Sequence, residues 1–252
     1  MDPHRLYVTG VFLLFLFAAV VFPVLFFVPA PYGRHRRKGW GPEIPDSLGW
    51  VIQESPSVLL FAWVFFRGEH ALELTPILLL ALWQAHYVQR TYVFPFLLRG
   101  RHRRVPITTV GLAVLFNCVN AFVNAYAIAH AREYPAGWAT DPRFVVGVML
   151  FLVGYSINRH SDAVLRALRG PGEDGYKVPQ SGLHRFVASP NYLGEILEWA
   201  GWAVASWSLA GLAFAVFTFA NLAPRARSHL RWYRERFPDY PEQRRALLPG
   251  IW

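Results

Sequence analysis

The chain has 252 residues, of which 54% are hydrophobic and 16% are charged, and its mean hydropathy is positive. A soluble domain carries charge on about a quarter of its residues, so this composition indicates a membrane protein. The net charge of +9 comes from 23 arginines and 2 lysines that cluster between apolar runs, which is typical of cytoplasmic loops and excludes a nucleic-acid groove. One cysteine, Cys118, excludes an internal disulfide and a cysteine-rich metal site.

Seven apolar segments are expected to cross a bilayer as helices. The first, residues 6–28, has 23 residues without a charge, which makes about 34 Å of helix at about 1.5 Å per residue. It is too long for a signal-peptide core and lacks a small-residue cleavage site before Pro29, so we expect it to be a membrane helix. The other expected spans are residues 48–66, 72–98, 107–131, 143–158, 192–207 and 209–224.

The basic residues predict the orientation of these spans. Of the 25, 20 follow odd-numbered spans, in three loops and in the C-terminal tail. Loops rich in arginine and lysine stay in the cytoplasm, so we expect the N-terminus outside and the C-terminus in the cytoplasm. The sequence therefore predicts an all-α polytopic membrane protein with seven transmembrane helices.

The second span contains an acid, Glu54, within the run Gln53-Glu54-Ser55-Pro56-Ser57. A carboxylate at the centre of a membrane helix costs about 2.5–3.5 kcal/mol on insertion scales. Such a residue marks a functional site that faces the interior of the protein. We therefore expect the other helices to build a cavity around Glu54.

The third span carries polar residues at spacings of three and four. Trp83, His86, Tyr87 and Arg90 share one helical face. We expect this face to point inward because lipid would not solvate Arg90. The alternative is that Arg90 extends to a membrane interface and Tyr87 anchors the helix there.

The fourth span carries Asn117, Asn120 and Asn124, again on one face. These amides either contribute to a site or form hydrogen bonds between helices, and the sequence leaves both interpretations open.

Beyond residue 158 the chain becomes more polar. The stretch 170–175 formally matches the dinucleotide fingerprint GxGxxG, but no strand precedes it, no helix follows it closely, and Glu173 and Asp174 would repel a pyrophosphate. We interpret this stretch as a turn-rich loop.

Two further faces suit a nucleotide. Glu195 and Trp199, together with Glu198, form a polar face that a ribose or amide pocket would need, although glutamates are also favoured at the start of a helix. Arg225, His229 and Tyr233 are spaced by four and could follow a phosphate-bearing ligand along a helix; attraction of basic residues to anionic lipid is the alternative.

These motifs, in this order and spacing, resemble the steroid 5α-reductases (3-oxo-5α-steroid 4-dehydrogenases). The similarity covers most of the chain and is densest from residue 158 to the end. Its pieces are Gln53-Glu54-Ser55-Pro56-Ser57, His86-Tyr87 with Arg90-Thr91, Glu133-Tyr134-Pro135 with Gly137-Trp138, His160-Ser161-Asp162, Tyr176 with Pro179-Gln180, Asn191-Tyr192-Leu193-Gly194-Glu195 with Glu198-Trp199, and Tyr240-Pro241 through Arg245-Ala246-Leu247 and Pro249.

The resemblance implies a membrane enzyme that uses NADPH to reduce the 4,5 double bond of a 3-oxo-4-ene steroid. Glu54 and Tyr87 would hold the 3-keto oxygen, with Glu54 neutral at pH 7, while hydride reaches C5 and a proton reaches C4. The residues expected to bind NADPH are Asn158, Asp162, Arg169, Tyr176, Asn191, Glu195, Trp199, Arg225, His229 and Tyr233. Lys177 stands where an arginine is common in the family, which leaves the phosphate contacts open.

We expect the substrate, a steroid or related lipid enone, to contact Gln53, Trp50, Arg90 and Asn120, and Tyr32 and Arg34 are further candidates for the site. Residues 1–252 would form one membrane domain, in which 1–142 supply the substrate cavity and 143–252 the NADPH-binding region. We expect a monomer without a metal or nucleic-acid partner.

Three other functions remain as alternatives. A membrane enoyl-CoA or sterol double-bond reductase would share NADPH, whereas an isoprenylcysteine-type methyltransferase would use S-adenosylmethionine and would not need an acid at Glu54. A non-catalytic lipid- or sterol-binding protein would use its polar faces only to hold the bundle together. The excess of arginine and alanine over lysine favours a bacterial source, hence an inner membrane over endoplasmic reticulum.

Overall fold

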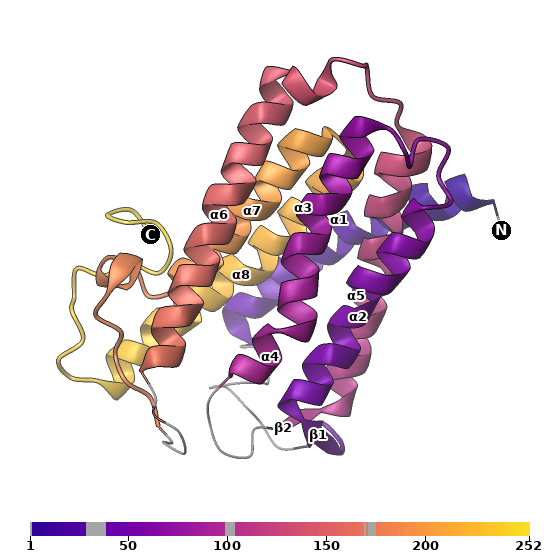
Figure 1. The fold of residues 1–252 in the computed structure, drawn as a ribbon. Coiled ribbons are helices and arrows are strands. Elements are labelled where there is room, and N and C mark those ends of the chain that lie inside the picture. Colours follow the sequence, from indigo (N-terminus) through magenta and orange to yellow (C-terminus); the bar gives the residue numbers. More distant parts are fainter. Residues whose placement is uncertain (1, 29–38, 99–103, 169, 171–174) are drawn as a thin grey trace.

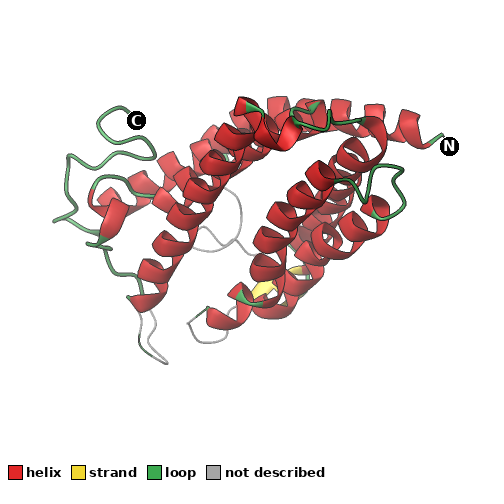
Figure 2. Ribbon diagram, turned by 45° about the horizontal axis from the view of Figure 1, so that its top comes forward, coloured by secondary structure: helices red, strands yellow, loops and turns green. Residues whose placement is uncertain are grey.

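A computed structural model describes residues 2–28, 39–98, 104–168, 170 and 175–252. Within them the chain forms a bundle dominated by seven helices of 17 to 28 residues (Figures 1 and 2). These helices are α1 (Pro3–Phe27), α2 (Asp46–Phe65), α3 (Leu74–Tyr92), α5 (Ile107–Tyr126), α6 (Pro142–Ala167), α7 (Pro190–Ser206) and α8 (Leu209–Arg236). Shorter turns are α4 (Phe94–Leu97), a π-helical turn (Ala127–Ala131) and 3₁₀ turns (Trp138–Thr140 and Gly182–Arg185).

Each expected span contains one of these helices, but two of them end later than the sequence predicts. Helix α6 continues to Ala167 instead of ending at residue 158, and α8 continues to Arg236 instead of 224. The expected ends were placed where the apolar run stops, whereas the backbone hydrogen bonds of a helix continue through polar residues in water. The polar extensions carry several of the expected cofactor residues.

Four of the described helices are long and apolar enough to cross a membrane: α1, α2, α8, and α5 with its π-helical turn. The other three long helices, α3, α6 and α7, carry more polar side chains that are buried inside the bundle. The length and composition of these four helices fit a membrane protein.

A two-stranded antiparallel sheet, which the sequence did not predict, ties two loops together. Strand β1 (Glu43–Pro45) pairs with β2 (Arg104–Pro106), and the Arg104 guanidinium donates to the Glu43 carbonyl at 2.7 Å. The strands lead directly into α2 and α5, so these two helices start at the same end of the bundle (Figure 1). Their common direction brings the asparagines of α5 alongside Glu54.

Helices α6 and α7 pack backbone against backbone. Gly147 and Gly154 of α6 face Gly194 and Gly201 of α7, and a Cβ atom on Gly154 would collide with the backbone of Glu198. Small residues at such contacts allow membrane helices to approach closely. The seven-residue spacing on both helices, about two turns, continues the contact along the pair.

The centre of the bundle is filled with aromatic side chains. Trp83, Trp199, Trp202 and Phe61 are almost fully buried, and the rings of Phe61 and Trp83 stack with centroids 4.4 Å apart. Helix α1 lies outside this core, crossing α5 and α8 (Figure 1), and most of its apolar surface is exposed. The core therefore joins α2 and α3 to α7 and α8, and the polar candidates surround it.

Candidate active site

Glu54 lies in the middle of α2, where neutral amides hold its carboxyl group. The Gln53 Nε2 atom donates to Glu54 Oε1, and Asn117 Nδ2 on α5 donates to Glu54 Oε2, both at 3.3 Å. Asn117 also donates to the Gln53 carbonyl at 2.7 Å. The same amide therefore fixes the backbone of α2 and orients the acid.

Tyr87 on α3 is 4% exposed. Its helix is joined to the helix of Glu54 by a hydrogen bond from Trp83 Nε1 to the Ser57 carbonyl at 2.7 Å. Ring contacts orient the phenol, because the Tyr87 centroid lies 4.8 Å from that of Trp83 and 5.5 Å from that of Trp199. The two residues that the sequence predicts as catalytic therefore lie on neighbouring helices, α2 and α3.

A buried pair that the sequence analysis did not predict connects α3 to α7. His86 Nδ1 lies 2.7 Å from Glu198 Oε1, and the two side chains are 6% and 0% exposed. Glu198 Oε2 is buried without a hydrogen-bond partner in the described part of the chain. The pair places the Trp199 ring against His86, at 4.7 Å between centroids, and so fixes Trp199 next to Tyr87.

Arg90 points into the bundle, as the sequence predicts, rather than towards a membrane interface. Its Nη1 atom lies 3.2 Å from Asp162 Oδ2 on α6, and its guanidinium lies over the rings of Trp50 at 4.6 Å and Phe94 at 4.3 Å. Asp162 Oδ1 accepts a hydrogen bond from Asn191 Nδ2 at 3.1 Å. Arg90 therefore joins the helix of Tyr87 to the expected cofactor residues.

Four of those expected residues form one polar cluster across α6 and α7. Asn158 Nδ2 donates to the Asn191 carbonyl at 3.0 Å and to Glu195 Oε2 at 3.3 Å. Asp162 joins the cluster through Asn191. The glycine contacts between α6 and α7 make this possible, since Gly194 lies against the backbone of Asn158.

The stripe on α8 lies on a single continuous helix, as its spacing predicts. His229 Nδ1 lies 3.2 Å from Ser189 Oγ at the start of α7, and the Arg225 guanidinium lies 5.2 Å from the centroid of the Tyr192 ring. Tyr233 is 2% exposed and stacks on Tyr240 at 5.1 Å. Burial raises the pKa of Tyr240, so its phenol stays neutral near pH 7.

The remaining expected residues have separate surroundings. Tyr176 packs its ring against Trp232 at 4.8 Å. Asn120 Oδ1 accepts from Asn124 Nδ2 at 2.9 Å, and Asn124 Oδ1 accepts from Trp202 Nε1 at 2.8 Å. Hydrogen bonding between helices therefore accounts for Asn124, while the buried Nδ2 atom of Asn120 has no partner among the described residues. Three expected residues, Arg169, Tyr32 and Arg34, lie outside the described residues.

The sequence model of the family described as 3-oxo-5-alpha-steroid 4-dehydrogenase matches residues 103–252. A 3-oxo-5-alpha-steroid 4-dehydrogenase 1 from Rattus norvegicus is 44% identical over 226 residues, which cover 89% of this chain and 87% of that protein. A 3-oxo-5-alpha-steroid 4-dehydrogenase 2 from Macaca fascicularis is 42% identical over 88% of each chain. A steroid 5-alpha-reductase from Gossypium hirsutum is 39% identical over 95% of each. The chain belongs to this family.

As a member of the 3-oxo-5-alpha-steroid 4-dehydrogenase family, the protein is an oxidoreductase, and membership implies a nicotinamide cofactor. The similarity extends across both halves of the bundle, because the relatives match most of the chain. Among the residues that the structure describes, no group of three or more His, Cys, Asp or Glu side chains could hold a metal ion.

One signal in the sequence could have revealed the His86–Glu198 pair. Each residue is an ionisable group on a helix face that is otherwise aromatic, next to Tyr87 or Trp199. Buried charges in such surroundings are paired as a rule. The sequence alone could not show which partner each one takes.

Proposed function

We propose that this chain reduces the 4,5 double bond of a 3-oxo-4-ene steroid with a hydride from NADPH. The observation that carries the proposal is the arrangement of Glu54, which accepts hydrogen bonds from two amides, and the buried Tyr87 on neighbouring helices, which the hydrogen bond from Trp83 Nε1 to the Ser57 carbonyl joins at 2.7 Å. Family membership supports reduction of a steroid double bond.

The reaction requires hydrogen-bond donors at the ketone. Hydride addition to C5 of an enone places negative charge on the 3-keto oxygen, and preorganised donors stabilise such a charge in the transition state. Tyr87 donates from its phenol, and Glu54 donates as a neutral acid. The hydrogen bonds to Glu54 come from neutral amides at 3.3 Å, and no guanidinium or ammonium group of the described residues hydrogen-bonds to it, which suits this role. The enolate then takes a proton at C4.

The polar and cationic side chains of the candidate site suit nicotinamide adenine dinucleotide phosphate (NADPH). When bound, NADPH supplies the hydride. In our proposal Asn158, Asp162, Asn191 and Glu195, as acceptors and amide donors, hold ribose hydroxyls and the carboxamide. Trp199 borders the nicotinamide.

The phosphates of the cofactor require cations. Arg225 and His229 on α8, together with Arg169, would hold them, since arginine forms bidentate hydrogen bonds with phosphate. Tyr176 and Tyr233 complete the proposed cofactor site. Support comes from Arg225 and His229, which both lie against Tyr192 at the start of α7, close in sequence to Asn191.

Four residues are proposed to shape the steroid end of the site. Gln53 and Trp50 belong to the same helix as Glu54, and the ring of Trp50 packs under Arg90. Asn120, whose buried Nδ2 atom has no partner among the described residues, is a candidate donor to the substrate. Arg90 would position the two halves of the site through Asp162.

We further propose that all seven long helices cross the membrane, with the N-terminus outside and the C-terminus in the cytoplasm. Helices α2 and α5 are the second and fourth of the seven long helices, so in this topology both start on the cytoplasmic side. Their common starting end in the bundle supports it. The arginine-rich composition favours a bacterial inner membrane. A monomer suffices, since one chain supplies both proposed parts of the site, the substrate end within 1–142 and the NADPH end within 143–252.

The decisive experiment follows the absorbance of NADPH after purified protein is mixed with a 3-oxo-4-ene steroid. The absorbance should fall and a 5α-reduced ketone should accumulate, and NADH should support the reaction less well. Parallel reactions contain an enoyl-CoA, or S-adenosylmethionine with a methyl acceptor. Oxidation of NADPH only with the enoyl-CoA would assign another reductase function, and methyl transfer would overturn the proposal.

A further inference from the structure

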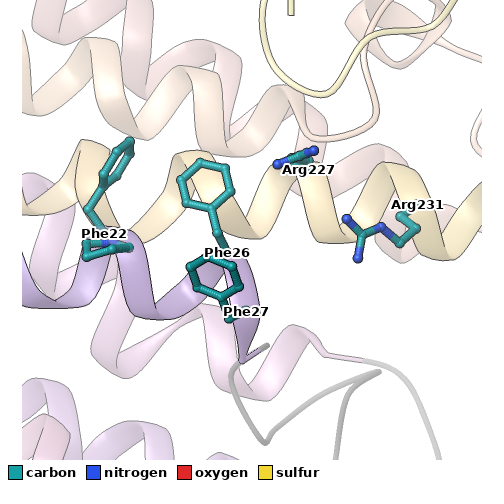
Figure 3. A pocket seen from close by; sticks show the side chains of 6 residues that line it. Phe22, Phe26, Phe27, Arg227 and Arg231 are labelled. Carbon is teal, nitrogen blue, oxygen red and sulfur yellow. The ribbon is translucent and has the colours of Figure 1, made fainter.

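A groove on the outer surface of the bundle lies between the end of α1 and the polar extension of α8. It encloses about 690 Å³ and is lined by Phe22, Pro23, Phe26, Phe27, Arg227 and Arg231. Figure 3 shows the phenylalanine rings along the groove, with the two guanidinium groups to one side of them. None of these residues belongs to the candidate active site.

The two arginines face away from that site. Arg227 and Arg231 are one turn apart on α8, and they lie about 200–240° around the helix from Arg225, at about 100° per residue. Helix α8 therefore carries two stripes of cations: one towards α7 and the proposed cofactor, and the other towards α1. The second stripe is not explained by the proposed reaction.

Both groove arginines lack an anionic partner within the described residues. Arg227 and Arg231 are exposed and take part in no ion pair there, although Glu235 follows Arg231 by one turn. The one described contact of the Arg227 guanidinium is with the face of the Phe26 ring, at 5.5 Å. The groove thus offers two unneutralised positive charges beside aromatic rings.

The apolar side of the groove is fixed in place and open to lipid. Phe22 packs on Phe219 of α8 at 6.0 Å between centroids, a contact that holds α1 against α8. Phe22 also packs on Phe26 of its own helix at 5.1 Å. Phe27 is 84% exposed. Residues 209–223 of α8 carry no charge, and the first arginine follows Pro224, so the groove lies where the hydrocarbon region ends and the headgroup region begins.

From this geometry we infer that the groove binds an anionic phospholipid. Arg227 and Arg231 contact the headgroup phosphate, and an acyl chain lies on Phe26 and Phe27. Cations at this depth attract anionic lipid, and aromatic rings at a membrane interface pack against acyl chains. The lipid also bridges α1 to α8, which are otherwise joined mainly by apolar contacts.

The test measures the melting temperature of the purified full chain in a nonionic detergent during titration with phosphatidylglycerol. A ligand of the folded state raises Tm by an amount that grows with the ratio of its concentration to its Kd. Arg227→Gln/Arg231→Gln should need about 30-fold more phosphatidylglycerol for the same Tm rise, as expected for the loss of two interfacial cations. The matched control, Arg185→Gln/Arg236→Gln, removes two exposed arginines elsewhere and should respond like the unchanged chain.

A second pair of variants tests the apolar side. Phe26→Ala should weaken the response several-fold, whereas Phe12→Ala, which removes an exposed ring of α1 outside the groove, should not. Equal responses of the two arginine variants would overturn the proposal. So would an equal Tm rise with phosphatidylcholine of the same acyl chains, or with inorganic phosphate alone. If the Arg227→Gln/Arg231→Gln variant instead lost its response to a 3-oxo-4-ene steroid, the groove would belong to the substrate path.

Discussion

Two carboxyl groups inside the bundle, the half-buried Glu54 and the buried Asp162, have different partners. Glu54 on α2 receives hydrogen bonds only from the amides of Gln53 and Asn117 in the described residues, whereas Asp162 on α6 forms an ion pair with Arg90 and a hydrogen bond with Asn191. A cationic partner suits an acid that works as an anion, and neutral amides suit an acid that donates a proton in a hydrogen bond. The difference supports the proposal that Glu54 takes part in the chemistry and Asp162 in binding.

The largest effect is expected at Glu54. In the proposed mechanism Glu54→Ala removes one of two donors at the ketone, and kcat should fall by about 10²–10³-fold, as when an oxyanion donor is lost elsewhere. Glu54→Gln should retain part of the activity because its amide still donates. Steady-state kinetics with NADPH and a 3-oxo-4-ene steroid measure both variants.

The control for this prediction is cofactor affinity. The Kd for NADPH, from quenching of tryptophan fluorescence, should stay near that of the unchanged protein in Glu54→Ala. A normal kcat in Glu54→Ala would remove Glu54 from the mechanism, and equal losses of cofactor affinity and kcat would indicate a disturbed fold.

A further carboxyl group, Glu198, is fully buried and has His86 as its partner. Glu198→Ala leaves His86 buried without its partner, and breaking such a pair costs about 3–5 kcal/mol. We expect the Tm of Glu198→Ala in detergent to fall by about 10 °C. The Tm of Glu198→Gln, which keeps a hydrogen-bonding group, should fall less. Differential scanning fluorimetry measures both. Equal Tm values for Glu198→Ala and the unchanged chain would show that the pair contributes nothing to stability.

At Asp162 the comparison predicts a loss of binding rather than of chemistry. Asp162→Ala removes the partner of Arg90 and the acceptor of Asn191, and we expect the Kd for NADPH to rise about 10–100-fold. The effect on kcat at saturating NADPH should be small. A double-mutant cycle with Arg90→Ala isolates the contribution of the ion pair, and strictly additive effects would mean that the two residues act independently.

The smallest effect is expected at Asp141, a partly exposed carboxylate at the start of α6. Arg143 donates to both of its oxygens and lowers the pKa of Asp141 to about 2. A carboxyl group whose pKa is lowered in the folded state stabilises the fold at pH values above its ordinary pKa. This contribution disappears as the pH falls through about 2. Asp141→Asn keeps the helix cap and removes the charge.

The Tm of Asp141→Asn should therefore lie only slightly below that of the unchanged chain at neutral pH. The small gap should close as the pH falls from the ordinary carboxyl range towards about 2, which scanning fluorimetry over a pH series records. If the Tm difference between Asp141→Asn and the unchanged chain grew as the pH fell, the ionised Asp141 would not stabilise the fold.

The sequence predicted the helices well and their ends less well. Apolar runs gave seven helices, because hydrophobic length decides which segments enter a membrane. The ends of α6 and α8 could not be read in that way, since no change in backbone hydrogen bonding accompanies the change from apolar to polar residues. The strands at Glu43–Pro45 and Arg104–Pro106 were missed because three residues, one of them a proline, give no alternating pattern.

The candidate site was predictable as a set of residues but not as a set of pairs. Helical spacing placed Arg90 with Tyr87 on one inward face, and the structure agrees. The partners Asp162 and Glu198 lie 72 and 112 residues from Arg90 and His86, so only the packing of α3 against α6 and α7 determines them. Periodicity within one helix contains no information about its register against another.

The glycine contacts between α6 and α7 determine where the sequence can accept insertions and deletions. Because Gly147, Gly154, Gly194 and Gly201 allow the two backbones to touch, a shift by one residue would place larger side chains where only hydrogen atoms fit. The alignment of Asn158 with Asn191 is thus set within the helices themselves and is independent of the segment that joins them. Insertions or deletions between Leu168 and Ser189 should change that connection while the polar cluster keeps its geometry.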